Sequence, residues 1–377
     1  MTDRLKRLRA ALEEERLGGL IVASAVDDVF GQFSANRRYV SGFSGSTGYA
    51  LVTATEAVFA ADFRYTVQAE RECAPLGFRV FRTEGRLKDW WPHLCDETAM
   101  AGKRLGVSRA DFSLGGYLAL LDATREMPLA GAPKLVWAPP IVERLRRHKG
   151  PGERRTIEAA VAAADGAFER VEDSILATQT ETEVAAAVES AVRACGGDGI
   201  SFATIVASGP QAALPHAQPT SACLGEGRPI TIDMGARVDG YCSDLTRTFT
   251  IGAWDARFAE IYAIVEEAQQ HAIENVEAGM TGVAAHELAA GIIERHGYGE
   301  RFGHGLGHGV GLEVHEAPYL GKTSDDTLEE GMIFTIEPGI YLPGWGGVRI
   351  EDIVVLEGGR ARVLSKARKL HLAGVGH

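Results

Sequence analysis

The sequence has few cysteines, no long hydrophobic run and no excess of positive charge, and each absence argues against a class of protein. Its five cysteines are scattered through 377 residues without a CxxC pair, which is typical of reduced thiols. No apolar stretch approaches the ~20 residues that cross a bilayer, and the N-terminus lacks the apolar segment of a secretory signal. The net charge of −12 argues against nucleic acid as a partner. We therefore expect a cytoplasmic protein that binds neither membranes nor nucleic acid.

The length indicates two or three domains, and the balance of 45% hydrophobic and 24% charged residues is that of a globular protein. Residues 1–140 alternate short strand patterns with helical ones, which predicts a smaller α/β domain. Residues 141–152 contain a basic run and a Gly-Pro-Gly segment, so we interpret them as a linker with solvated charges. Residues 153–377 interleave helices with Gly-rich hairpins, which predicts an α+β domain. In this domain we expect helices at 153–177, 181–195, 257–278 and 283–296.

Two predicted hairpins each carry a pair of acidic residues. Asp233 and Asp244 lie almost symmetrically about a turn at 238–240, and Glu337 and Glu351 lie symmetrically about Gly344. Residues placed in this way face each other across a hairpin, with Cβ atoms about 5 Å apart. Like charges so close, among apolar neighbours, repel each other and resist ionisation. Two divalent cations would balance the four carboxylates.

A glycine-rich segment, 302–316, adds histidines to this set. Glycines allow close backbone approach, and the segment around His308 contains five of them. One histidine with four carboxylates makes an oxygen-rich site, which suits Mn²⁺ better than a structural zinc. Either hairpin alone would equally fit solvent-facing acids paired with Arg247 or Arg349, and the glycine-rich segment alone would fit a surface loop. The three together, in this order, favour a metal site.

These segments resemble the proline-specific metallopeptidases of the "pita-bread" fold, aminopeptidase P and prolidase. In the second half the resemblance rests on the sequences around the four acids and on 304–316; in the first half, 39–46 and 61–65 look like a creatinase-type N-terminal domain. It implies an α+β pita-bread catalytic domain behind a smaller α/β domain. It also implies a dinuclear hydrolase that cleaves the Xaa-Pro bond of short peptides, and a homodimer.

The resemblance assigns a role to each metal ligand. Asp233 ligates one metal and Asp244 bridges both; His308 and Glu337 ligate the second metal, and Glu351 bridges. The cofactors are then two divalent ions, with Mn²⁺ favoured and Co²⁺ or Zn²⁺ as alternatives.

The resemblance also implies a substrate site beside the metals. Histidines at the positions of His216, His304 and His315 line this site in relatives, and His216 or His315 would stabilise the developing oxyanion. Glu337 is the implied proton shuttle to the leaving prolyl nitrogen. Arg349 orients Glu351, binds a substrate carboxylate or forms a plain salt bridge, and these alternatives stay open.

The kind of peptide substrate is the main open alternative. Several prolidases have a basic residue after the His-Glu-x-Pro stretch, suited to a dipeptide's carboxylate, whereas here Tyr319 follows Pro318. This favours an Xaa-Pro aminopeptidase over an Xaa-Pro dipeptidase. Methionine aminopeptidase is disfavoured by the short gap between the two glutamates, and a metal-free creatinase-like hydrolase or a non-catalytic peptide-binding protein by the intact ligand set.

Overall fold

The computed structural model describes residues 3–24 and 34–370 of the chain. The chain divides into two compact units, Met1–Arg146 and Arg147–His377. None of the helices in the described ranges is both long and apolar enough to cross a membrane.

The first unit is built on one mixed six-stranded sheet in the order β4-β3-β2-β1-β5-β6. Its strands are β1 (Gly19–Val22), β2 (Tyr49–Thr53), β3 (Ala57–Ala61), β4 (Arg79–Arg82), β5 (Arg104–Val107) and β6 (Lys134–Trp137). Its helices are α1 (Asp3–Glu14), α2 (Ala35–Ser41), α3 (Thr66–Cys73), α4 (Leu87–Glu97), α5 (Leu114–Arg125) and α6 (Ile141–Arg146). Helix α1 buries Leu5, Leu8 and Leu12 on one face, as their spacing of three and four residues requires. The α/β prediction for this part of the chain is confirmed.

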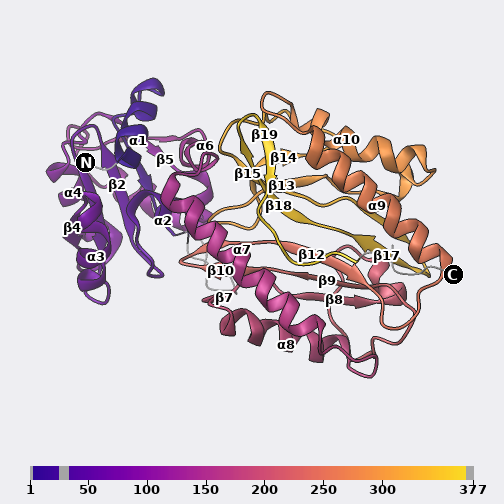
Figure 1. The fold of residues 1–377 in the computed structure, drawn as a ribbon. Coiled ribbons are helices and arrows are strands. Elements are labelled where there is room, and N and C mark those ends of the chain that lie inside the picture. Colours follow the sequence, from indigo (N-terminus) through magenta and orange to yellow (C-terminus); the bar gives the residue numbers. More distant parts are fainter. Residues whose placement is uncertain (1–2, 25–33, 371–377) are drawn as a thin grey trace. The chain divides into compact units, whose positions relative to one another are not determined.

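Antiparallel sheets and two helix pairs make up the second unit (Figure 1). The helices are α7 (Pro151–Glu172), α8 (Glu181–Ala194), α9 (Ala256–Asn275) and α10 (Gly282–Arg295). Helices α7 and α8 pack against each other and share a hydrophobic core with a three-stranded sheet, whose strands are β8 (Ile205–Ser208), β9 (Ile230–Met234) and β12 (Leu245–Phe249). A smaller sheet continues it through β7 (Gly199–Ile200), β10 (Ala236–Val238) and β11 (Tyr241–Cys242).

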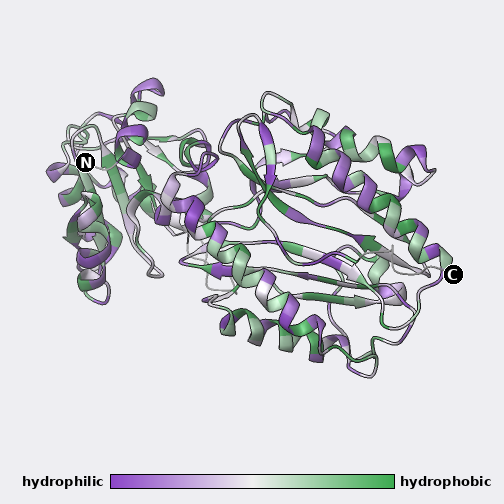
Figure 2. Ribbon diagram, viewed as in Figure 1, coloured by the Kyte–Doolittle hydropathy of each residue, from purple (hydrophilic) through white to green (hydrophobic). Residues whose placement is uncertain are grey.

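Helices α9 and α10 form the second pair and share a core with a five-stranded sheet and a hairpin. The sheet is β13 (Gly307–Gly309), β14 (Glu316–Leu320), β15 (Ile333–Ile336), β18 (Asp352–Glu357) and β19 (Arg360–Val363), and the hairpin is β16 (Gly339–Leu342) with β17 (Gly346–Arg349). Figure 2 shows hydrophobic residues running along the strands, while the helices alternate hydrophobic and hydrophilic residues as amphipathic helices do. This arrangement confirms the predicted α+β class.

The register of the first hairpin corrects one expectation. Asp233 pairs with Thr246 rather than with Asp244, which precedes β12. The turn has two residues, Asp239 and Gly240, both at positive φ (44° and 78°), so the hairpin axis passes between them, and the partner of Asp233 is two residues beyond Asp244. Asp244 is therefore a diagonal neighbour of Asp233.

The second hairpin keeps the predicted register. Ile336 pairs with Asp352 and Gly339 with Arg349, which places Glu337 opposite Glu351. The two glutamates form a pair without a direct backbone bond, because the Glu337 amide donates to Leu306 O (2.8 Å) and the Glu351 amide donates to Thr246 O (3.1 Å), while the Ile350 amide next to them donates to Pro338 O (3.4 Å).

The basic run at the junction is not wholly solvated, contrary to our interpretation of the linker. The Lys149 side chain is 1% exposed and its ammonium lies 2.7 Å from Glu316 Oε1, while Arg147 and His148 pair with Asp326 and Glu329. Pro151 also belongs to the first turn of α7, where its missing N–H costs nothing.

Candidate metal centre and substrate pocket

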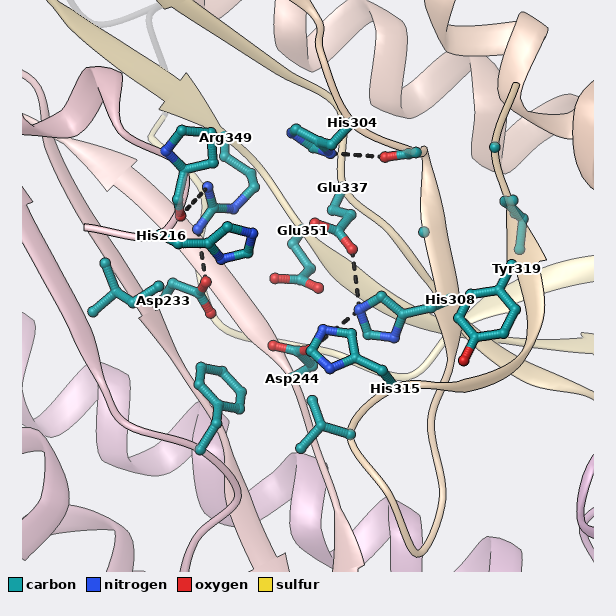
Figure 3. Close-up of a pocket in the computed structure, with 18 of the residues that line it drawn as sticks. His216, Asp233, Asp244, His304, His308, His315, Tyr319, Glu337, Arg349 and Glu351 are labelled. Carbon is teal, nitrogen blue, oxygen red and sulfur yellow. Dashed lines mark hydrogen bonds and ion pairs between the residues drawn. The ribbon is translucent and has the colours of Figure 1, made fainter. Parts of the chain in front are cut away.

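A pocket of about 780 Å³ opens in the second unit. All nine residues predicted for the site line it, together with apolar side chains such as Phe202, Ile205 and Val314. The nine are Asp233, Asp244, His308, Glu337, Glu351, His216, His304, His315 and Arg349. In Figure 3 the four carboxylates and His308 face one common space. Sequence positions more than 100 residues apart are therefore gathered around a single cavity.

The core of this cluster is a histidine among carboxylates. His308 Nε2 lies 3.2 Å from Glu337 Oε1 and 3.6 Å from Asp244 Oδ2. Ligand atoms of Asp244, His308 and Glu351 all lie within 4.8 Å of one another. Three such groups converging on one point can share a cation, and the fourth carboxylate, Asp233, lies across the same space (Figure 3).

Strand geometry brings His308 close to the acids. His308 is in β13 between Gly307 and Gly309. A Cβ on Gly307 would lie 2.0 Å from Thr335 O, and one on Gly309 would lie 2.4 Å from Ala317 O. Because no side chain fits in these gaps, the neighbouring strands can approach the histidine only with glycine on both sides. The predicted reason for the glycine-rich segment, close backbone approach, holds at these two positions.

Asp233 has one oxygen engaged and one free. Arg349 donates to Asp233 Oδ2 at 2.6 Å, whereas Oδ1 is buried and has no hydrogen-bond partner among the described residues. A buried carboxylate oxygen without a partner costs free energy unless something positive fills its place. This oxygen is therefore suited to bind a cation.

The protonation states of the acids are strongly perturbed. Burial, followed by the charges of neighbouring carboxylates, raises the pKa of Asp244 and of Glu351 well above the usual range. Burial also raises the pKa of Asp233, although Arg349 opposes the shift. Burial alone would raise the pKa of Glu337, but the hydrogen bond and charge of His308 lower it to about 2. The cluster thus holds more negative charge than the protein alone stabilises, and divalent cations fit it.

Three further histidines surround the cluster. His304 Nε2 lies 2.8 Å from the Tyr341 hydroxyl, and burial lowers the pKa of His304. The ring of His315 lies 4.2 Å from that of His308, and burial together with the His308 charge lowers the pKa of His315 to about 4. His216 lies beside Arg349 and Asp233 in Figure 3. Imidazole nitrogens at these positions can form hydrogen bonds to a bound peptide.

Sequence reasoning missed three hydroxyl residues that hold the acids and Arg349. Thr246 donates to Glu351 Oε2 at 2.6 Å, and Thr335 donates to Glu337 Oε1 at 3.1 Å. Arg349 donates to Thr246 Oγ1 at 3.0 Å and to the Tyr341 hydroxyl at 2.9 Å. The signal was available, because Thr335 precedes Glu337 by two residues and Thr246 follows Asp244 by two. Arg349 forms the predicted salt bridge, with Asp233, and hydrogen bonds through Thr246 link it to Glu351.

Comparison with known families matches both halves of the chain. The model of metallopeptidase family M24 matches residues 155–357. The creatinase/prolidase N-terminal domain model matches residues 4–148. The uncharacterized peptidase YqhT of Bacillus subtilis is 36% identical over 360 residues, covering 94% of this chain and 98% of YqhT. The Xaa-Pro dipeptidase of Pyrococcus furiosus is 42% identical over 229 residues, 61% of this chain and 66% of its own length.

Solved structures resemble the chain over nearly its whole length. The Xaa-Pro dipeptidase from Bacillus anthracis has a TM-score of 0.89 and 36% identity, covering 98% of both chains. The X-Pro aminopeptidase from Thermotoga maritima has a TM-score of 0.87 and 34% identity, covering 98% of this chain and 99% of its own. These likenesses confirm the predicted pita-bread fold with a creatinase-type N-terminal domain.

Proposed function

Because the chain belongs to metallopeptidase family M24 and is a hydrolase of the prolidase and aminopeptidase P type, we propose that it cleaves the Xaa-Pro bond at the N-terminus of short peptides. The observation that carries this proposal is the convergence of four carboxylates and His308 on one pocket that is otherwise lined by histidines and apolar side chains. The apolar part of the lining suits a proline ring, and the net negative cluster suits a free α-amino group.

We further propose a dinuclear site in which Asp233, Asp244, His308, Glu337 and Glu351 hold two divalent cations. The buried, unpartnered oxygen of Asp233 and the raised pKa of Asp244 and Glu351 support this assignment. The oxygen-rich donor set favours Mn²⁺, with Co²⁺ or Zn²⁺ as alternatives. Such cations lower the pKa of bound water and so make a nucleophile available at neutral pH.

Side chains of the protein would transfer the proton and bind the peptide. Glu337 is held by His308 and Thr335, and the hydrogen bond and charge of His308 lower its pKa against the effect of burial, so its carboxylate can take a proton from the attacking water. It would pass this proton to the prolyl nitrogen, which carries no hydrogen in the peptide and leaves as an amine. His216 or His315 would donate a hydrogen bond to the developing oxyanion, and His304 would line the substrate site.

The dipeptidase alternative now has more support than the aminopeptidase prediction, because several of the similar proteins are described as Xaa-Pro dipeptidases. We therefore propose Xaa-Pro dipeptides as the first substrate class. Cleavage of longer peptides remains the second candidate, supported by Tyr319. This side chain lines the pocket and is 48% exposed, and it offers no charge to a dipeptide's carboxylate.

The decisive experiment strips the protein with a chelator, adds back Mn²⁺, Co²⁺ or Zn²⁺, and assays three substrates in parallel. These are an Xaa-Pro dipeptide, an Xaa-Pro-Xaa tripeptide and the same tripeptide with alanine in place of proline. Metal-dependent turnover of the dipeptide alone supports the dipeptidase proposal, and turnover of the proline tripeptide supports the aminopeptidase. Turnover of neither proline substrate with any of the three metals would contradict the proposed function.

We also propose a cytoplasmic homodimer that binds neither nucleic acid nor membranes. The net charge of −12 and the likeness to the family support this proposal. Analytical ultracentrifugation of the purified chain tests the dimer directly, and a monomer at micromolar concentration would contradict it.

A further inference from the structure

A glutamine on helix α9 connects the two strands that carry the paired glutamates. Gln269 is 1% exposed and does not line the pocket. Its Nε2 donates to Ile336 O and to Ile350 O, both at 3.1 Å. These two carbonyls belong to the residues immediately before Glu337 and Glu351, so one side chain holds the backbone next to both predicted ligands.

The amide orientation of Gln269 follows from the chemistry of its partners. Its Oε1 accepts from the Lys369 ammonium at 2.7 Å, and an ammonium can only donate. The opposite side faces carbonyl oxygens, which can only accept, and Asp352 Oδ2 at 3.2 Å. A flipped amide would lose every one of these hydrogen bonds, so Lys369 fixes which way Gln269 points.

Buried charges surround this amide. Asp352 is 1% exposed and pairs with Arg247 at 2.7 Å and with Lys369 at 2.6 Å. Arg247 also donates to the backbone carbonyl of Glu351. The charges are therefore matched by partners, as a buried network must be if it is to rigidify its surroundings.

The location of the amide matters because the backbone ladder is weak there. The Glu337 and Glu351 amides donate to Leu306 and Thr246, outwards from the pair that they form. The direct bond beside them, from the Ile350 amide to Pro338 O, is long at 3.4 Å, and Pro338 has no N–H to return it. The separation of the two glutamates therefore depends also on Gln269, which joins their strands from α9.

We propose that Gln269 is a positioning residue that sets the spacing of Glu337 and Glu351 for cation binding, with Lys369 holding its amide in place. The inference rests on the metal site of the proposed function, but it is independent of which peptide is cleaved. Residues that hold metal ligands in place without binding the metal typically change metal affinity by roughly 10–100-fold when they are mutated.

The test measures metal binding directly. Mn²⁺ is titrated into metal-free wild type, Gln269→Met and Lys369→Met, with free Mn²⁺ followed by electron paramagnetic resonance. Met keeps the length of the glutamine side chain but cannot donate a hydrogen bond, so we expect Gln269→Met to weaken binding by roughly 10–100-fold. Lys369→Met should weaken it less, because the glutamine remains.

Val265→Ala is the matched control. Val265 is fully buried on the same helix, and its apolar side chain cannot form a hydrogen bond to either glutamate strand. It should lower the melting temperature of the metal-free protein and leave Mn²⁺ affinity unchanged. Co²⁺ absorption spectra add a second readout, since altered glutamate spacing would change the ligand field in Gln269→Met and not in Val265→Ala.

Wild-type affinity and spectrum in Gln269→Met would overturn the inference. If Gln269→Met does not fold, Lys369→Met decides, because its side chain is 28% exposed and its loss is better tolerated; unchanged affinity there would also overturn it. A wild-type protein that binds no Mn²⁺, Co²⁺ or Zn²⁺ contradicts the proposed metal site itself, and the inference fails with it.

Discussion

The guanidinium of Arg349 donates to a carboxylate oxygen of Asp233 across 2.6 Å, with only 5% and 13% of the two side chains exposed. The same guanidinium reaches Thr246 and Tyr341, so it ties one predicted metal ligand to the supports of Glu351 and His304. Burial disfavours the charged guanidinium, but Tyr341 and the carboxylates, Asp233 first, outweigh it and raise the pKa of Arg349 well above its usual value. Arg349 therefore remains charged at any working pH.

Replacing Arg349 with lysine should damage the site even though the charge is kept. An ammonium cannot donate to Asp233, Thr246 and Tyr341 in their present directions, because it lacks the planar fork of a guanidinium. We expect Arg349→Lys to lower kcat/KM and Mn²⁺ affinity by roughly 10–100-fold. Steady-state kinetics and metal titration measure both, and Arg362→Lys, at a half-exposed arginine paired with Glu357, is the control. Equal activity of the two variants would remove Arg349 from the supports of the site.

His315 should stay neutral through the ordinary pH range of the metal-free protein. Burial and the charge of His308 lower its pKa to about 4, against about 6.5 for a free imidazole. Between these values the unfolded chain binds a proton that folded His315 does not, so stability from this group is present above pH 6.5 and falls as pH drops towards 4. NMR titration of the imidazole resonances, assigned with His315→Gln, gives the pKa. A midpoint near 6.5 would contradict the environment described here.

The sequence predicted which residues gather at the pocket far better than it predicted their supports. Carboxylates on either side of a hairpin turn and a histidine between glycines are local patterns, and such patterns can be recognised in a single sequence. The exact partner of Asp233 was wrong because a shift of one residue in the turn centre moves a cross-strand pair by two.

The supports depend on contacts that no local pattern reports. Gln269 lies in a helix whose sequence predicts only amphipathic packing, and its partners follow it by 67 and 81 residues. Lys149 belongs to a basic, glycine-rich stretch that has the same composition whether its charges are solvated or buried. Tertiary structure alone brings Glu316 to it, 167 residues later.

The rate at which each cysteine reacts with an alkylating agent should depend on its burial. Cys223 is exposed, whereas Cys73, Cys95 and Cys242 are buried, and burial raises the pKa of Cys73 and of Cys95 to about 12. Because the thiolate is the reactive form, iodoacetamide at pH 8 should modify Cys223 rapidly and the buried three only after unfolding. Peptide mapping by mass spectrometry measures the order, with Cys223→Ser as control. Rapid labelling of Cys95 in the native protein would contradict its burial.

Replacing one partner of the buried ion pair between Lys149 and Glu316 should lower the free energy of unfolding. Their ammonium and carboxylate oxygen lie 2.7 Å apart with 1% and 7% of the side chains exposed, and Glu316 directly follows the pocket residue His315. Lys149→Met removes the ammonium from a buried ion pair, and the removal of one partner of such a pair typically costs about 3–5 kcal/mol of unfolding free energy. The strand start at Glu316 would shift to relieve this, so we also expect a higher KM with a smaller change in kcat.

Two further variants separate charge from packing at this pair. Lys149→Met combined with Glu316→Gln should recover part of the lost stability, because a neutral amide is cheaper to bury than a charged carboxylate. Arg360→Met removes an ion pair with Glu277 that is about half exposed on both sides, and it should cost about 0–1 kcal/mol. Urea unfolding gives the free energies, and hydrogen exchange of peptides covering residues 305–320 reports whether the pocket wall opens. If Lys149→Met is as stable as Arg360→Met, the pair contributes no more than a surface contact, and His315 owes its position to the strand alone.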